Sequence, residues 1–562
     1  MADASAAGGK ERARAPAVPL VSTLQNAPVN LVALREDGAR MLFDILDSMP
    51  GKTFMALDST VSGPLKLMVP PPDNNALLKE HGVGGLVDTI PEEPITTACE
   101  SVLFIVRPQL DLVARIAAQI RAFHSAREDK HVAVYFVPKR TFLCEHVLKE
   151  EGVFADIATI GEFPIDLVPY DDDLLSMEMP SAFRECLLDG DSTSLNYVVQ
   201  SIQKLQSLYG TIPHIKAKGT LSKIVLDMMD RIRREEDAQP STTPPEIDTL
   251  ILLDREVDLV TPMMSPLTYE ALIDEIFGIE DSFVKIEKAL FKEGDEKKAA
   301  EAERKMRILP LNSNDQLYAE IRDLNVLAVS AVLGERSRTL QATYAGRSTT
   351  DLGELKKFVK KLPNMQAMVK SLETQIAIGS LITKTTSSES FREQWRMERA
   401  MIENSDSAEV AAYIQQMIWK CEPVLNVLRL LCLRCSTDGG LKQKEYDSIR
   451  REIVHSYGFD WLFTLNNLEK LGMLRASSGR NPWPAIVKDL ELVDDDVDVV
   501  HPKDIHYVTA GYAPLSVRLV QLAMARRSGW AEHASALKAL PGPPPDEVDI
   551  TDGDPVGGSG AE

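Results

Sequence analysis

Four charged residues follow directly on a short apolar run near the middle of the chain, and their types could support chemistry. The run is Thr249 to Leu253, and Asp254, Arg255, Glu256 and Asp258 come after it. Carboxylates that converge on one point can bind a hard cation or act as general acid and base. The alternative is an Asp254–Arg255 ion pair with Asp258 as a turn acceptor. This alternative is favoured, because a cation needs several oxygen ligands and no histidine lies nearby in the sequence, so we expect no catalytic residue and no metal site here.

The elements that must position these residues are a strand, a turn and a helix. The apolar, β-branched run 249–253 predicts a strand buried on both faces, and ligands of open α/β sheets bind at the carboxyl ends of such strands. Thr261 and Pro262 predict a rigid exit from the strand. Ser265 is a good N-cap and Pro266 suits a first helical position, ahead of apolar residues at helical spacing: Tyr269, Leu272, Ile273, Ile276 and Phe277. The segment is therefore interpreted as a scaffold joint.

The same segment carries a family resemblance. LLDREVDLVTPMMSPLTYEALIDEIFGI resembles the pattern LLDRxxDLxTPxxxxxTYExLIDExxGI of the SM (Sec/Munc) family of SNARE-binding proteins, and VPKRTFLCEHVLKEEGV (137–153), LNSNDQLYAEIRD (311–323) and HYVTAGYAPLSVRL (506–519) are similar to the family in the same order. The resemblance covers about residues 30 to 541 and is closest to the A-type SM subunit of the class C vacuolar protein sorting branch. The residues that form its structural signature are Asp254, Arg255, Asp258, Thr261, Pro262, Tyr269 and Glu270.

Composition excludes several classes of partner. The 562 residues include 62 basic and 84 acidic side chains, a net charge of −22, which repels nucleic acid and anionic lipid headgroups. No apolar run approaches the roughly 20 residues of a membrane span, and the N-terminus lacks the apolar core of a signal peptide. We therefore expect a cytoplasmic protein with reduced cysteines, no nucleic-acid partner, and membrane contact only through other proteins.

Motifs for catalysis or cofactor binding are missing or weak. Gly82, Gly84 and Gly85 have the wrong spacing for a dinucleotide loop, and no G-x-x-x-x-G-K-[ST], G-x-S-x-G or H-E-x-x-H is present. Cys432 and Cys435 form a C-x-x-C in a leucine-rich helix, but a zinc site needs two more ligands at matching spacing. We expect these cysteines to pack in a core, and we expect neither a cofactor nor an enzyme; a hydrolase or nucleotidase is a minor alternative.

The order of patterns predicts a mixed α/β and α fold. Strands at 53–57, 65–69, 101–106 and 131–137 alternate with helices at 32–46 and 110–123, which is typical of a parallel sheet. Long helical patterns then replace the strands until a strand at 506–509 and a helix at 515–525. We expect two Rossmann-like, parallel-sheet α/β domains with a large helical domain inserted in the second, and the resemblance implies that the three domains form an arch.

The predicted boundaries place most of the chain in these three domains. They are a disordered arm (1–28), domain 1 (29–158), domain 2 (159–277 plus 499–541), helical domain 3 (278–498) and a disordered acidic tail (542–562). The family usually continues past LPGP to another apolar strand and helix. The Gly- and Pro-rich tail predicts no strand, so we expect either that the second sheet is one strand short or that the chain is a shortened form.

The resemblance also implies partners and surfaces. One SNARE would lie along a cleft of domain 1 and the helical domain, and another on a helical hairpin mapped to 352–381, with its bend near Pro363. Exposed hairpin side chains that could receive an acidic amphipathic helix, or could merely solvate the hairpin, are Lys356, Lys357, Lys360, Lys361, Met365, Met368 and Lys370. A sister subunit would dock on 440–474, where the candidate anchors, equally explained by core packing, are Tyr446, Ile449 and Trp461.

The implied function involves no chemical step. The chain is expected to be a SNARE-binding SM subunit of the tethering complexes HOPS and CORVET, templating SNARE assembly for fusion at late endosomes, lysosomes or vacuoles. Its expected partners are syntaxin-type and vesicle SNAREs and the class C vacuolar protein sorting subunits. The alternative is a stand-alone SM protein that clasps one syntaxin at another transport step.

Overall fold

The computed structural model describes residues 29–69, 74–235, 244–287, 306–345, 352–477, 479, 481–525 and 529–550. The predicted arm, 1–28, lies outside these residues. The chain forms two compact units: unit 1 comprises residues 1–178, 280–283 and 310–314, and unit 2 comprises 179–279, 284–309 and 315–562. The predicted three-domain boundaries remain a prediction.

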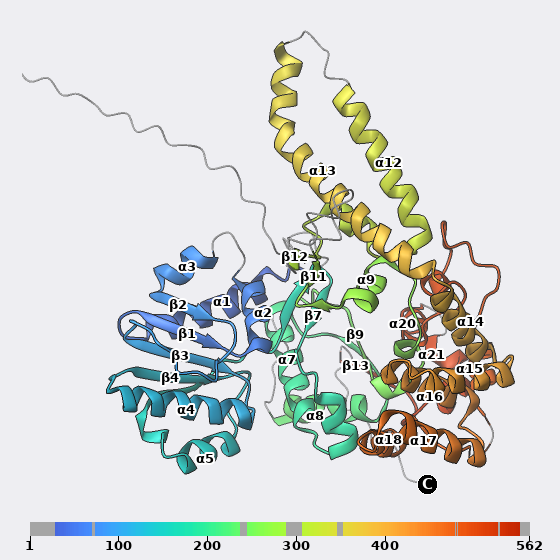
Figure 1. The fold of residues 1–562 in the computed structure, drawn as a ribbon, viewed down its shortest axis with the longest axis horizontal. Helices are drawn as coiled ribbons and strands as arrows, with labels where there is room; N and C mark the ends of the chain where they lie inside the picture. Colours follow the sequence, from blue (N-terminus) through green and yellow to red (C-terminus); the bar gives the residue numbers. More distant parts are fainter. Residues whose placement is uncertain are drawn as a thin grey trace, which may run out of the picture. The chain divides into compact units, whose positions relative to one another are not determined.

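Unit 1 contains a five-stranded parallel sheet in the order β2-β1-β3-β4-β5 (Figure 1). The strands are β1 (Thr53–Leu57), β2 (Val83–Val87), β3 (Ser101–Val106), β4 (His131–Phe136) and β5 (Ile157–Glu162), and the main helices are α1 (Val32–Asp47), α2 (Ser59–Met68), α3 (Asn74–Glu80), α4 (Leu110–Ala126) and α5 (Phe142–Glu150). All six residues of β3 are buried. Leu103 and Ile105 pack in one cluster with α1 and α2, whereas Val102, Phe104 and Val106 pack in another with α4 and α5. Because strand side chains alternate, both faces of the sheet are covered, as predicted for a parallel sheet.

The predicted strand at 65–69 is wrong. Leu65 to Met68 form the last turns of α2, which begins after Asp58, whose side chain accepts a hydrogen bond from the amide of Thr60. An Asp N-cap favours a helix, and the apolar run then supplies the buried face of that helix. Apolar runs of this length do not distinguish a buried strand from a buried helix segment.

A second sheet, in unit 2, has the order β13-β8-β9. β8 (His214–Lys218) lies between β9 (Thr249–Leu253), to which it is parallel, and β13 (Asp546–Asp549), to which it is antiparallel; α7 (Thr193–Tyr209) and α8 (Thr220–Glu235) precede and follow β8. β9 is the strand predicted at 249–253, but all five of its residues are only half-buried, so the expectation of burial on both faces is wrong. The reason is its place at an edge of this sheet among the described strands.

The predicted disorder of 542–562 is also wrong for its first part, and so is the expectation that this tail supplies no strand to the second sheet. Residues 546–549 form β13 even though three of the four are acidic, because the facing strand and helix offer His214, Lys216 and Lys223 as ion-pair partners. Val548 adds an apolar contact with Ile215 and Ala217. Residues 551–562 lie outside the described part of the chain.

The helical region of unit 2 is dominated by α-helices, as predicted. These are α9 (Tyr269–Phe277), α11 (Gln316–Ile321), α12 (Val326–Ala345), α13 (Leu352–Thr386), α14 (Glu389–Glu403), α15 (Ser407–Trp419), α16 (Val424–Asp438), α17 (Gln443–Tyr457), α18 (Trp461–Lys470), α19 (Trp483–Asp489), α20 (Leu515–Met524), α21 (Gly529–Glu532) and α22 (Ala534–Ala539).

Short strands complete the fold: β6 (Val168–Asp171), β7 (Leu174–Ser176), β10 (Ile279–Glu280), β11 (Phe283–Glu287) and β12 (Met306–Pro310).

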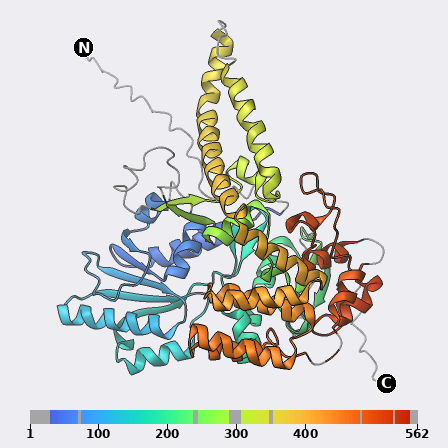
Figure 2. The ribbon, with the colours of Figure 1, turned by 45° about the vertical axis from the view of Figure 1, so that its right-hand side comes forward.

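The helical hairpin is built differently from the prediction. α13 runs without interruption through Pro363, and the two arms of the hairpin are α12 and α13, which lie side by side (Figures 1 and 2). A proline inside a helix removes one hydrogen bond and often kinks the helix, but it does not always end it. The predicted bend near residues 362–364 is therefore wrong, because α12 ends at Ala345 and α13 begins at Leu352.

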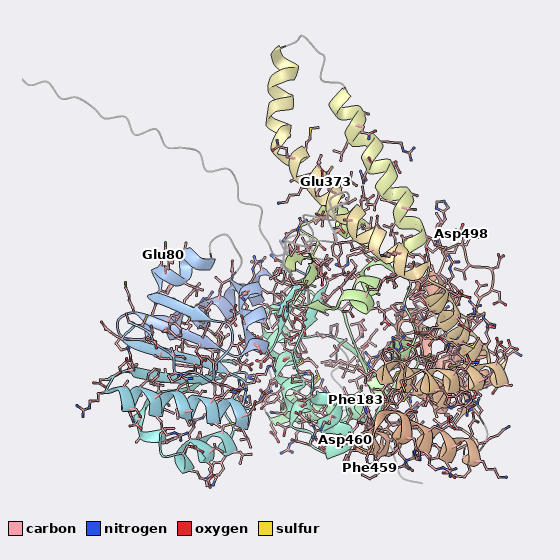
Figure 3. All side chains as sticks on the ribbon, in the orientation of Figure 1. Glu80, Phe183, Glu373, Phe459, Asp460 and Asp498 are labelled. Carbon is pink, nitrogen blue, oxygen red and sulfur yellow. The ribbon has the colours of Figure 1, made fainter. Side chains whose placement is uncertain are left out.

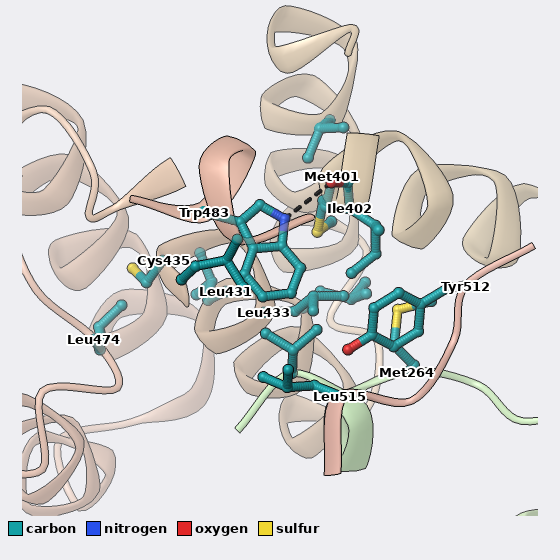
Figure 4. Packing of buried hydrophobic residues seen from close by; sticks show 14 of the residues in the cluster. Met264, Met401, Ile402, Leu431, Leu433, Cys435, Leu474, Trp483, Tyr512 and Leu515 are labelled. Carbon is teal, nitrogen blue, oxygen red and sulfur yellow. Dashed lines mark hydrogen bonds between the residues drawn. The ribbon is translucent and has the colours of Figure 1, made fainter. Parts of the chain in front are cut away.

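The largest core cluster joins α14, α15, α16, α17 and α19 to the segment around α20 (Figure 4). Trp483 is buried in it and donates a hydrogen bond to the carbonyl of Ile402 at 2.9 Å. Tyr512 and Leu515 reach the same cluster from the end of the chain, so the α20 segment belongs with the helical region in packing. The predicted strand at 506–509 is wrong, since 505–508 form a 3-10 helix whose His506 is buried.

Candidate functional site

The first acidic residue of the signature segment, Asp254, caps helix α8. It is 7% exposed, and its two carboxylate oxygens accept hydrogen bonds from the amides of Leu221 and Ser222, each at 2.7 Å, and from the Ser222 hydroxyl. Gly219 makes this approach possible: its φ is +120°, and a Cβ there would lie 2.2 Å from the Asp254 carboxyl carbon. Asp254 forms no ion pair with Arg255, so the favoured pair is wrong, and the carboxylate accepts from a helix N-terminus instead.

The next two signature residues, Asp258 and Thr261, hold the start of α20. Asp258 is 2% exposed and accepts from the Thr261 amide at 2.9 Å, which confirms it as a turn acceptor. Its other oxygen accepts from the amide of Ser516 at 2.8 Å, and the Thr261 hydroxyl accepts from the amide of Leu515 at 3.2 Å. Residues more than 250 positions apart are thus joined through the free amides of a helix N-terminus. Pro262 lies in the short 3-10 helix that follows, Thr261–Met263.

Ser265 does not cap α9, contrary to the prediction; Thr268 occupies that position. Ser265 instead donates from its amide and its hydroxyl to Glu398 of α14, at 2.7 and 2.9 Å. Burial raises the pKa of Glu398, and hydrogen bonds from Gln394 and Ser265, with the positive charge of Arg429, oppose the rise. The loop before α9 is therefore fixed to α14 by a fully buried carboxyl.

Tyr269 and Glu270 attach α9 to the base of the hairpin. The hydroxyl of Tyr269, which is fully buried, donates to the side-chain oxygen of Gln375 on α13 at 2.9 Å and lies 3.1 Å from its carbonyl oxygen. The Glu270 amide donates to the carbonyl of Arg322, and the two side chains form an ion pair at 3.0 Å. Gln375 also donates to Asp315 at 3.1 Å, so α9, α11 and α13 share one hydrogen-bond network.

These contacts define the signature as a junction. Each of its acidic side chains accepts hydrogen bonds at a helix N-terminus or forms an ion pair. These are structural roles, as in the alternative to catalysis or metal binding that the sequence favoured. Among the described residues, no group of three or more His, Cys, Asp or Glu side chains is arranged to hold a metal ion. Cys435 lies in the core of Figure 4, and burial raises the pKa values of Cys432 and Cys435 to about 12 and about 11, as for unreactive packed thiols.

The predicted hairpin surface is partly accessible. Met368 is 38% exposed and Lys370 is exposed, but Met365 is 8% exposed, so its prediction as an exposed contact is wrong. The reason is that α13 packs along α12 and buries part of its apolar surface. Ile376, which the sequence did not single out, is 43% exposed. The side chains of Lys356, Lys357, Lys360 and Lys361 lie outside the described residues.

The predicted sister-subunit anchors are placed in the interior. Tyr446 and Ile449 are 5% and 7% exposed and belong to the main core cluster, and Trp461 is half-buried against it. Core packing, the alternative kept open from the sequence, therefore explains Tyr446 and Ile449. Their role as sister-subunit anchors stays a prediction.

Neighbouring aromatic residues are exposed instead. Trp419, Phe459 and Phe463 are 65%, 67% and 67% exposed, and Phe459 lies at the turn that leads into α18 (Figure 3). Phe463 lines a hollow of about 510 Å³ with residues of α18, and Trp419 lines one of about 500 Å³ with residues of α17. Exposed large apolar side chains of this kind are candidates for interaction surfaces. The sequence offered one signal that we missed: Phe459 directly follows Gly458, which ends α17.

Comparison with known proteins identifies the class. The solved structure "SM Protein Vps45 in Complex with Qa SNARE Tlg2 (1-310)" superposes with a TM-score of 0.51 at 16% identity, covering 92% of this chain and 88% of that one. The chain therefore has the fold of an SM protein, and the predicted fold class is confirmed.

The family follows from the sequence comparisons. A model of the Sec1 family matches residues 54–559, and the chain belongs to that family. It is 41% identical over 528 residues to "Vacuolar protein sorting-associated protein 33A" of Rattus norvegicus, covering 93% of this chain and 87% of the relative. It is 39% identical to "Vacuolar protein-sorting-associated protein 33 homolog" of Arabidopsis thaliana, covering 93% and 85%. The resemblance to the vacuolar branch of SM proteins is thus confirmed.

Proposed function

We propose that the protein is a SNARE-binding SM subunit of HOPS- and CORVET-type tethering complexes, which templates SNARE assembly for fusion at endosomes, lysosomes or vacuoles. The observation that carries this proposal is the similarity to vacuolar protein sorting relatives along 93% of the chain. The SM protein of similar fold is in complex with a Qa SNARE, which supports the same kind of partner here. The function is to hold partner helices in register rather than to carry out a reaction, so we propose no catalytic residue.

The protein is proposed to reach membranes through partners. In the described part of the chain, no helix is long and apolar enough to cross a bilayer. The net charge of −22 repels anionic headgroups, so direct adsorption is disfavoured. We place the protein in the cytoplasm and at the surface of late endosomes, lysosomes or vacuoles.

The α12–α13 hairpin is the proposed SNARE-template surface. Met368, Lys370 and Ile376 combine exposed apolar and basic groups on α13, and Lys356, Lys357, Lys360 and Lys361 add four basic residues earlier on the same helix. An amphipathic helix with an acidic flank would match this chemistry. The network of Tyr269, Gln375 and Asp315 supports the base of the surface.

The test is a binding titration of the full-length protein against soluble SNARE-motif fragments of syntaxin and vesicle types. Changing the four lysines at 356, 357, 360 and 361 to Glu should weaken binding at least tenfold, more at low salt, because exposed ionic contacts are screened. The matched control changes two exposed lysines elsewhere, Lys488→Glu and Lys503→Glu, which should leave binding unchanged. Equal binding by the hairpin variant and the native chain would remove the hairpin from the proposal.

The exposed aromatic surface of Trp419, Phe459 and Phe463 is the proposed sister-subunit site. Aromatic anchors that become desolvated dominate protein interfaces, and each of these three side chains is about two-thirds exposed in the isolated chain. The double change Phe459→Asp and Phe463→Asp should abolish co-purification with the class C subunits while SNARE-fragment binding persists. Phe142→Asp, at an 81% exposed phenylalanine of α5, is the control and should retain both.

A further inference from the structure

Strand β13 is attached to β8 by antiparallel backbone pairing and by three ion pairs. The antiparallel register places Glu547 opposite Lys216 and Asp549 opposite His214. The ion pairs are Lys216–Glu547 at 3.4 Å, His214–Asp549 at 3.3 Å and Lys223–Asp546 at 2.8 Å. The carboxylates of Glu547 and Asp549 are 54% and 45% exposed, so solvent and salt reach these contacts. Contacts that solvent and salt can reach are typical of a reversibly bound segment rather than of a buried core strand.

The other face of the strand makes a small apolar contact. Val548 and Ile550 pack against a cluster formed by Ile215, Ala217 and Leu226. The Ile550 amide also donates to the carbonyl of Pro213 at 2.8 Å. Residues 546–550, which we name the acidic strap, therefore present an acid–acid–apolar–acid–apolar pattern to one edge of β8.

The segment before the strap has a separate anchor. Lys218, the last residue of β8, is fully buried, and its ammonium donates to the carbonyls of Pro541 and Pro543, each at 2.8 Å. Gly542, at φ +80°, lies directly against Gly219, where a Cβ would meet the Gly219 backbone at 2.9 Å. The chain is thus fixed at 541–543 by contacts that do not involve the strap, so the strap can leave β8 while its anchor stays.

We propose that this edge of β8 is a binding site for an extended acidic segment of a partner protein, which the acidic strap occupies in cis. Main-chain hydrogen bonds along a sheet edge give affinity for any extended segment, and alternate side chains give selectivity. His214, Lys216 and Lys223 select acidic residues at three positions, and the cluster around Ile215 selects apolar residues at two. The surface is independent of the hairpin, so the proposal goes beyond SNARE binding.

The strap would control access by competition. A segment tethered through a short linker reaches an effective concentration of about millimolar, so a free segment of equal affinity is largely excluded. A partner segment gains the site when it is itself held near the protein, or when the strap is released. Salt weakens both occupants because each relies on exposed ion pairs.

The test uses a fluorescent peptide of residues 544–552, PPDEVDITD, and fluorescence anisotropy. One protein is the intact chain, the second ends after Pro545 and so keeps the partners of Lys218, and the third is full-length with Glu547→Lys and Asp549→Lys. The peptide should bind the second and third proteins at least tenfold more tightly than the first. The third protein keeps the experiment decisive where the shortened chain fails to fold.

A charge exchange provides the matched control. Lys216→Glu in the chain that ends after Pro545, which has no strap to pair with the new carboxylate, should weaken peptide binding about tenfold, and a peptide with Glu547→Lys should recover most of it. Lys538→Glu, at an exposed lysine of α22, should have no effect. Equal binding to intact and strap variants, or indifference to Lys216→Glu, would overturn the proposal. Exchange of the strap between two copies, seen as a concentration-dependent dimer that binds no peptide, would also overturn it.

Discussion

Removing the carboxylate of Asp254 tests whether the family signature is structural. In the Asp254→Ala variant, the amides of Leu221 and Ser222 and the Ser222 hydroxyl lose their acceptor at a buried helix N-terminus. A buried donor left without a partner costs about 1 to 3 kcal/mol, and loss of an N-cap costs about 0.5 to 2 kcal/mol. Water can partly replace the lost acceptor once the side chain is gone, which keeps the total below the sum of the separate costs. We therefore expect a loss of about 3 kcal/mol in local stability.

The assay must be local because a chain of two compact units need not unfold in one step. Amide hydrogen exchange in the first turns of α8 should become about a hundredfold faster, since about 1.36 kcal/mol is a factor of ten. Asp254→Asn keeps one acceptor oxygen and should give a smaller effect. Asp248→Ala, at a carboxylate that is 79% exposed, is the control and should change exchange little.

Two results would refute the structural role of Asp254. One is unchanged exchange in α8 for Asp254→Ala, which would mean that the cap carries no stability. The other is loss of SNARE binding with native exchange throughout, which would mean that the carboxylate binds a partner or an ion.

Three further predictions concern polar groups of the same unit. Tyr269→Phe should destabilise the base of the hairpin by about 1 to 2 kcal/mol, because it leaves the buried side-chain oxygen of Gln375 without a donor, and exchange at 372–378 should report it. Burial raises the pKa of Asp504, but hydrogen bonds, led by the one from Gln521, outweigh this and lower it to about 2. The folded pKa is thus below the unfolded value of about 4, so this stability is complete above about pH 4 and is lost toward about pH 2; Asp504→Asn should flatten that part of an acid-unfolding curve. Addition of EDTA should leave the unfolding midpoint unchanged, because the oxygens of Asp258 are taken by backbone amides, and a shift would restore the metal alternative.

The sequence predicts most of unit 1 because local pattern and tertiary packing agree there. The runs at 53–57, 101–106 and 131–137 are strands in the structure, and their alternating side chains cover both sheet faces. The run at 65–69 is equally apolar, and only the cap at Asp58 marks it as a helix. Periodicity alone cannot decide such a segment.

Contacts between distant residues explain the other errors. Ser265 has the residue type of an N-cap, but the buried Glu398, 133 positions away, takes its amide and hydroxyl. The acidic tail contains a strand because β8, far earlier in the chain, offers it basic partners, which composition cannot show. The helix through Pro363 is longer than local propensity predicts.

For the candidate interaction surfaces, too, the sequence predicts the region but not the individual residues. A resemblance can place a docking region at 440–474, but it cannot separate the buried Tyr446 from the exposed Phe459 within it. Both are aromatic residues close to helical patterns, and only packing distinguishes them. The exposed aromatic surface on α15 and α18 is therefore a finding of the structure.

The most direct test of the proposed function is a mild affinity purification of the tagged full-length protein from an extract of its own cells, with mass spectrometry of the proteins that accompany it. We predict the large class C tethering subunits in near-equal amount, with SNAREs at lower yield, and loss of the subunits alone in the Phe459→Asp, Phe463→Asp variant. Recovery of one syntaxin without any tethering subunit would contradict this prediction and would identify a stand-alone SM protein of another transport step.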